Sequence, residues 1–183
     1  MGSSTTRIIS PLLNGIALII CIVSLSIDTL SFFTYESLGI DIKYGYGYNK
    51  TWVTDENGMD NFPYDCKTDH DSPLCSSGAV WMVIAMLATF SIALAFISSL
   101  IAKGNAVKNV SILFNIIGSI LAFIASVVWL GGSGHSSLKD LTEDLRIGFS
   151  VMMMATVIVE SLMAGLFTYV WKAEIEWESK YVN

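Results

Sequence analysis

Four long stretches almost free of charged side chains constrain this chain more than any other feature of its sequence. They cover residues 8–27, 72–102, 109–138 and 147–171, and Glu160 is the one charge among them. The hydrocarbon core of a bilayer is about 30 Å thick, and a helix needs roughly 20 apolar residues to cross it. The pattern therefore predicts an all-α membrane protein, a four-transmembrane-helix bundle with spans near residues 8–33, 78–101, 110–130 and 147–171.

The composition agrees with a membrane environment. Hydrophobic residues make up 53% of the chain and charged residues only 14%, with a mean hydropathy of +0.60, whereas soluble domains carry about 25% charged residues. The net charge of −6 argues against a nucleic-acid partner, because proteins that bind nucleic acid concentrate Lys and Arg on one face. A cleavable signal peptide is the alternative for residues 8–27. Its apolar core would be only about 7–15 residues long, so we expect a true span.

The loops between the spans predict the topology. The short turn between the second and third spans carries Lys103 and Lys108 and no acid, which is typical of a cytoplasmic loop. We therefore expect a single domain over residues 1–183 in the plasma membrane, with both termini cytoplasmic. The remaining segments are then a first extracellular loop (34–77), a second extracellular loop (131–146) and a cytoplasmic tail (172–183) that continues the fourth helix.

The first loop is acidic and holds two of the three cysteines. It carries three lysines against eight acidic residues, a net charge of −5. Cys66 and Cys75 are expected to form a disulfide, because a loop this small has little core and lies on the oxidising side of the membrane. Asn49 begins an Asn-Lys-Thr glycosylation sequon in the same loop. Cys21, inside the first span, is expected to be a packing residue.

Residues 40–48 of this loop alternate with period two, which predicts a β-strand. Ile40, Ile42 and three tyrosines fall on one face, and residues 51–54 could form its partner strand. Two roles are open for the aromatic face: it rests on the helix ends, or it binds a partner.

Two acidic side chains belong to the predicted spans. Asp28 is close to the outer end of the first span and is interpreted as boundary polarity. Glu160 is near the bilayer midplane, where a charged carboxylate costs several kcal/mol. We expect it to form an interhelical hydrogen bond, for example to Asn115 or Ser119; an ion or proton path, as in a transporter, is the alternative.

Small residues repeat at four-residue spacing in the two central spans. Such stripes allow close approach of helix backbones in lipid and predict a tightly packed bundle. They are Ser91, Ala95 and Ser99 in the second span, and Gly118, Ala122 and Ser126 in the third.

The sequence contains no recognisable catalytic arrangement. The two histidines are in different loops, and no nucleophile has a base at a familiar spacing. We therefore expect no enzyme activity, no metal site and no cofactor. The acidic run with Asp55, Glu56 and Asp60 is interpreted as a solvated face that, if the chain lined a pore, would favour cations.

The topology and three loop residues resemble the claudin and peripheral myelin protein superfamily. In that family, a tryptophan in the first loop is followed by two cysteines, and Trp52, Cys66 and Cys75 stand here in that order with eight residues between the cysteines. The tripeptide Gly-Leu-Trp that precedes the first cysteine in claudins is replaced here by residues 62–65. The terminal Asn183 differs from the apolar ends of many claudins and argues against a PDZ scaffold as a partner.

The resemblance implies a small extracellular β-sheet formed by the first loop and lying on the bundle. It also implies a function in cell–cell adhesion, junctions or membrane-domain organisation, with the lipid bilayer, a second copy of the chain or a larger membrane protein as partners. The alternative function is that of an accessory subunit of a channel or receptor complex.

Overall fold

Four long helices dominate the computed structural model, which describes residues 3–27, 29–37, 40–48, 50–55, 58–63, 73–101, 104–131 and 146–181. They are α1 (Ser3–Ile27), α2 (Pro73–Leu100), α3 (Asn105–Gly131) and α5 (Phe149–Tyr181). All four are long and apolar enough to cross a membrane, as the sequence predicts, and they indicate a multi-pass membrane protein.

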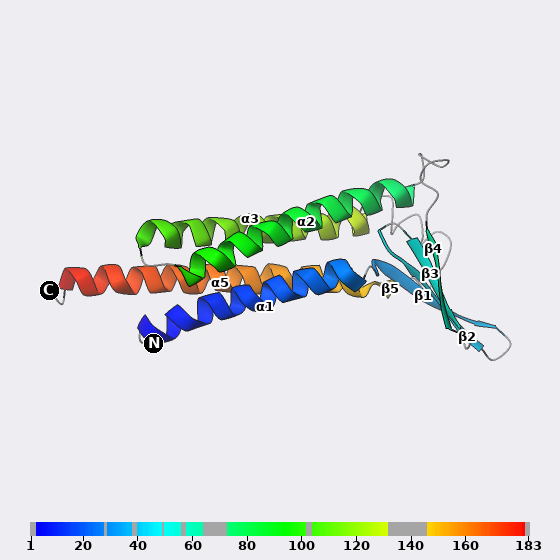
Figure 1. The fold of residues 1–183 in the computed structure, drawn as a ribbon, viewed down its shortest axis with the longest axis horizontal. Coiled ribbons are helices and arrows are strands. Elements are labelled where there is room, and N and C mark those ends of the chain that lie inside the picture. The colour runs from blue at the N-terminus through cyan, green and yellow to red at the C-terminus, as the bar shows by residue number, and fades with distance from the viewer. Residues whose placement is uncertain are drawn as a thin grey trace.

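The helices form a bundle in which neighbours in space run antiparallel. In Figure 1, α2 lies along α3 and α1 lies along α5, and α3 also packs against α5. The start of α1 and the end of α5 lie together at one end of the bundle, here called the termini end, and the sheet lies at the other, the sheet end. This arrangement puts both chain ends on the same side of a membrane that the helices cross.

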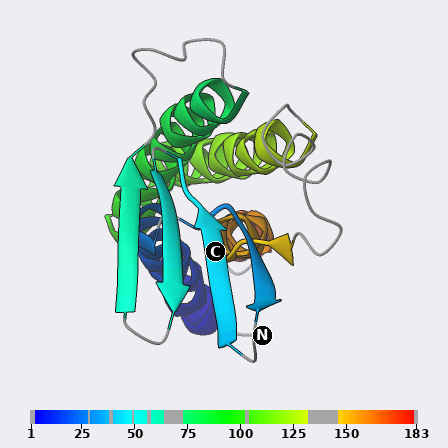
Figure 2. The same ribbon diagram turned by 90° about the vertical axis from the view of Figure 1, so that its right-hand side faces the viewer.

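A five-stranded antiparallel sheet covers one end of the bundle (Figure 2). Its strands are β1 (Ser31–Ser37), β2 (Ile40–Tyr46), β3 (Lys50–Asp55), β4 (Gly58–Pro63) and β5 (Arg146–Ile147), in the order β4-β3-β2-β1-β5. The alternation in residues 40–48 and its pairing with residues 51–54 are confirmed, because β2 pairs with β3. The first loop does not build the sheet alone, however: β5 comes from the segment just before α5 and pairs with β1.

The predicted end of the first span is wrong by several residues. Residues 31–33 belong to β1, and α1 ends at Ile27. An apolar run can continue from a helix into a strand without any change in hydropathy, and aromatic residues such as Phe32 and Phe33 favour strands. At the other end of the chain, α5 continues through the predicted tail to Tyr181.

The small residues of α2 and α3 are buried in the bundle, in agreement with the close helix packing that their spacing predicts. All six residues of the two stripes are buried. A Cβ atom on Gly118 would lie 2.7 Å from Cγ1 of Ile92, so the glycine allows the two helices to approach closely. The hydroxyl of Ser111 also donates a hydrogen bond across this contact to the carbonyl of Ala95 (3.1 Å).

The sheet is joined to the bundle where α1 passes into β1 and β5 passes into α5. The N–H of Leu30 donates to the carbonyl of Tyr46 (2.8 Å), and the N–H of Gly148 donates to the carbonyl of Leu30 (2.8 Å). The N–H of Ser150 donates to the carbonyl of Thr29 (2.9 Å), and the hydroxyl oxygen of Ser150 accepts from the N–H of Thr29 (3.0 Å). We call residues 29–30 and 148–150 the junction.

Replacing Gly148 by alanine should destabilise the protein, because a Cβ at this position would overlap the carbonyl oxygen of Thr29. Relieving this contact means separating the two segments of the junction, at a cost of about 1–3 kcal/mol. Thermal unfolding of the purified protein in detergent should show a lower midpoint for Gly148→Ala. The matched control is Gly104→Ala, because no described atom lies within 4 Å of the place that its methyl group would take. Equal midpoints for the two variants would contradict the role given to the junction.

Candidate functional site

The aromatic side chains of the sheet that face the bundle anchor it to the helix ends. The ring of Tyr48 stacks on that of Trp81 in α2, with centroids 6.4 Å apart, and Tyr46 packs against the buried core. The indole N–H of Trp129 in α3 donates to the hydroxyl of Ser31 in β1 (2.8 Å). Of the two roles open for the aromatic face, the structure shows contact with the helix ends.

A second aromatic contact stiffens the same face of the sheet. Phe33 and Tyr44 are directly opposite in β1 and β2, and their rings stack at 4.9 Å with an interplanar angle of 8°. The ring of Phe33 also lies 6.3 Å from that of Tyr46. Burial raises the pKa of the Tyr46 hydroxyl above its ordinary value.

The opposite face of the sheet, which we call the outer face, is directed away from the bundle. Thr34 and Lys43 are cross-strand partners on this face, and both are exposed. Trp52 is opposite Gly45, and its ring occupies the space where a side chain of Gly45 would be. The glycine therefore allows the tryptophan ring to lie flat on the outer face of β2.

The pairing of Trp52 with Gly45 can be tested with a double-mutant cycle. A Cβ on Gly45 would overlap the indole ring, so Gly45→Ala should displace the ring and cost about 1 kcal/mol of stability. In a Trp52→Ala background the same substitution should be almost neutral, since no ring is left to displace. Thermal unfolding of the four proteins measures the coupling, and strictly additive effects would contradict the contact.

The predicted loop sites are only partly within the described residues. Cys75 is disulfide-bonded and Cys21 is free and buried, while the pairing of Cys75 with Cys66 stays a prediction. Asp55 is the last residue of β3, and Asp60 is exposed in β4 opposite Val53. The other predicted positions, Asp28, Asn49, Glu56 and Cys66, lie outside the described residues.

A buried polar cluster joins α3 to α5 in the middle of the bundle. The hydroxyl of Ser161 lies 2.9 Å from the backbone carbonyl of Asn115 and 3.0 Å from its side-chain Oδ1. The Nδ2 of Asn115 donates to the carbonyl of Ser111 (3.0 Å), and the hydroxyl of Ser119 donates to the carbonyl of Asn115 (2.8 Å). Glu160 is half-buried beside this cluster and forms no hydrogen bond or ion pair with any described residue. The interhelical bond expected for Glu160 is therefore made by its neighbour, Ser161.

Ser161 was not among the residues predicted from the sequence, because a serine within a helix is usually bonded to its own backbone. A spacing signal was present, since Ser161 is one of several small or polar residues on one face of α5. That face is buried and consists of Ser150, Val151, Met154, Val157, Ser161, Ala164, Gly165, Thr168 and Trp171.

Asn14 in α1 is also buried, but its amide is unpaired. Its side chain is 0% exposed, and neither its Nδ2 nor its Oδ1 has a hydrogen-bond partner among the described residues. Leaving a polar group unpaired in the interior costs about 1–3 kcal/mol. The two buried asparagines of the bundle therefore differ, because the amide of Asn115 is hydrogen-bonded and that of Asn14 is not bonded to any described residue.

The contrast between the two asparagines predicts opposite responses to one substitution. Asn14→Leu should raise the thermal midpoint in detergent, because it removes an unpaired amide and keeps a similar volume. Asn115→Leu should lower it by about 1 kcal/mol, because it removes hydrogen bonds within a helix contact in the membrane. A loss of stability in both variants would show that Asn14 has a partner when the protein is in a bilayer or micelle.

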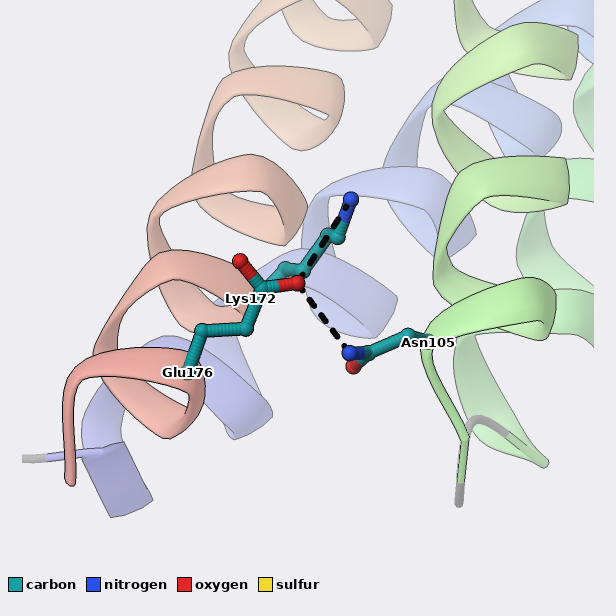
Figure 3. A network of polar contacts seen from close by, with 3 residues as sticks. All are labelled: Asn105, Lys172 and Glu176. Atoms are coloured by element: carbon teal, nitrogen blue, oxygen red, sulfur yellow. Dashed lines mark hydrogen bonds and ion pairs between the residues drawn. The ribbon is translucent and has the colours of Figure 1, made fainter. Parts of the chain in front are cut away.

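At the termini end, cations and an acid tie α3 to α5. Figure 3 shows that Nδ2 of Asn105 donates to Oε1 of Glu176 (3.1 Å) and that Nζ of Lys172 lies 3.8 Å from the same oxygen. Lys108 is buried nearby, with its Nζ 4.4 Å from the centroid of the Trp171 ring. This is a cation–π contact, which stabilises a lysine away from water.

These features define a four-helix protein with a rigidly seated sheet at one end and a polar cluster in its middle. Within the described residues, no three His, Cys, Asp or Glu side chains lie close enough to hold a metal ion. No model of a known protein family matches the chain, and no curated protein sequence matches it. The function is therefore inferred from the geometry of this structure and from the resemblance in topology and loop residues.

Proposed function

We propose that this chain is a claudin-like protein of the plasma membrane that acts in cell–cell adhesion, junction formation or membrane-domain organisation. Its acidic first loop, stapled by a disulfide between Cys66 and Cys75, is the extracellular surface that makes the contacts. The partner is a second copy of the chain, in the same membrane or on a neighbouring cell, or a larger membrane protein.

The way the sheet is seated supports this proposal more than any other observation. Its aromatic face packs on the helix ends through Tyr46 and Tyr48, which are partly buried, so that face already has a contact within the chain. The outer face is fixed in orientation by the junction and is directed away from the bundle (Figure 1). A rigid sheet presented in this way binds without first losing conformational entropy, which favours recognition between surfaces.

The charges and the disulfide support the proposed orientation. Lys108 and Lys172 are at the termini end, and positive residues are typical of the cytoplasmic side. Cys75, which is disulfide-bonded, begins the apolar part of α2 at the sheet end. Disulfides persist on the extracellular side, so the sheet end is assigned to the outside and both termini to the cytoplasm.

The proposal is tested by microscopy of tagged protein in mixed cultures of expressing and non-expressing cells. Adhesion between copies predicts enrichment only at borders between two expressing cells. The double substitution Thr34→Glu and Lys43→Glu changes two exposed neighbours on the outer face and should abolish the enrichment. The control Lys180→Glu also replaces a positive charge by a negative one, but at the termini end of α5, far from the sheet. It should leave the enrichment at cell borders intact.

A uniform surface signal, unchanged by the outer-face substitutions, would contradict adhesion between copies. It would favour the accessory subunit, whose large partner should then co-purify with the chain. An entirely internal signal would contradict the proposed plasma-membrane location.

A further inference from the structure

A groove of about 230 Å³ opens between α3 and α5 on the surface that faces lipid when the helices cross a bilayer. Asn115 and Ser161 are at its floor, and both are buried. Leu162, Leu166 and Tyr169 line its sides on α5 and are half or more exposed. The groove therefore combines a closed floor with apolar walls that are accessible from the membrane.

The groove offers an apolar surface along most of its length. The polar atoms at the floor are bonded to one another, because the hydroxyl of Ser161 is used by Asn115 and the amide nitrogen of Asn115 is used by Ser111. Gly165 has no side chain, which leaves room beside Asn115. A ligand that lies in this groove therefore needs no polar group in the middle of the molecule. A polar group there would find no hydrogen-bond partner in the membrane.

The groove ends at Tyr169 toward the termini end of the bundle. Tyr169 is 59% exposed and is the last residue of α5 that lines the groove. Lys172 and Glu176 follow one and two turns further along α5 and form an ion pair, and Glu176 also accepts a hydrogen bond from Asn105 (Figure 3). From Ser161 to Tyr169 the groove extends about 12 Å along the helix, at 1.5 Å per residue. Tyrosines at such positions lie at the level of the lipid headgroups.

We propose that this groove binds a sterol, with its hydroxyl at Tyr169 and its fused rings along Leu166, Leu162 and the floor at Gly165. An apolar body with one hydroxyl at its end suits a groove whose accessible lining is apolar and which ends at a tyrosine. A rigid ring system loses little conformational entropy when it is bound, whereas a phospholipid acyl chain must be ordered. The groove is smaller than pockets that enclose a ligand, about 300–1,000 Å³, so one face of the sterol stays in contact with the bilayer.

The spacing of residues on α5 supports the same ligand. Leu166, Tyr169 and Lys172 follow the order Leu-x2-Tyr-x2-Lys, a pattern associated with sterol contact. Here two of the three residues line the groove and the third is in the polar network at its end.

The test uses the full-length protein in lipid nanodiscs with a photoreactive sterol analogue, and the labelled peptides are identified by mass spectrometry. Labelling should map to the two helix segments that line the groove and should be competed by unlabelled sterol. Leu162→Trp fills the groove and should reduce labelling at least about fivefold through steric overlap. Tyr169→Phe removes one hydroxyl and should weaken binding about two- to tenfold.

The matched control is Leu113→Trp, because Leu113 on α3 is as exposed as Leu162, at 54% against 50%, and is not part of the groove. This variant should be labelled like the unsubstituted protein. Equal labelling of the Leu162 and Leu113 variants would overturn the proposal. So would equal labelling by a sterol with the inverted hydroxyl configuration or by a photoreactive phospholipid, since either result would show a contact with bulk lipid instead of a sterol site.

Discussion

The hydrogen-bonded junction between residues 29–30 and 148–150 holds the sheet and the helices of this protein in one arrangement. Three hydrogen bonds join these two short segments to each other, and the N–H of Leu30 donates a further one to Tyr46 in β2, so that α1, the sheet and α5 are connected at a single place. Leu30 is 0% exposed there, so the bonds are shielded from water. Shielded backbone bonds are expensive to break, because the freed groups would stay unpaired. The sheet therefore keeps one orientation relative to the helices, and any function of its outer face depends on that orientation.

Within the bundle, shape and hydrogen bonds replace the hydrophobic effect as the source of specificity. Lipid is as apolar as the helix surfaces, so burial in the bundle yields little free energy by itself. Close contact is achieved instead by small residues, such as Gly118 against Ile92, and by hydroxyls that cross between helices, such as Ser161. α1 and α5 are held in the same way, since the hydroxyls of Ser10 and Thr168 are bonded and the hydroxyl of Ser24 donates to the carbonyl of Ser150.

Hydropathy predicted the four helices, because a span needs a minimum length of apolar residues whatever its neighbours are. Residue spacing also predicted close packing through the small residues of α2 and α3, which are buried, and the alternation in β2. Hydropathy failed at residues 31–33, where an apolar run leaves a helix and enters a strand. It also missed β5, because a strand of two residues is too short to show a period. This strand forms by pairing with the edge of β1. From the sequence, Glu160 was expected to form a hydrogen bond with Asn115, because a charged residue in a span is conspicuous. In the structure the partner of Asn115 is Ser161.

Local sequence patterns were enough to predict four helices that are long and apolar enough to cross a membrane, because the length of each apolar run is visible in the run itself. They were also enough to predict a short sheet with one aromatic face, because alternation with period two is visible within a single strand. The buried face of that sheet could be known only from the assembled fold, because it depends on Trp81 and Trp129 reaching the sheet from helices far away in the chain. The assembled fold also determines which polar residues meet. Asn14 and Asn115 are alike in local sequence terms, but a hydroxyl from another helix reaches only Asn115 among the described residues. Pairing across helices depends on their relative rotation and depth, and no single segment encodes either one.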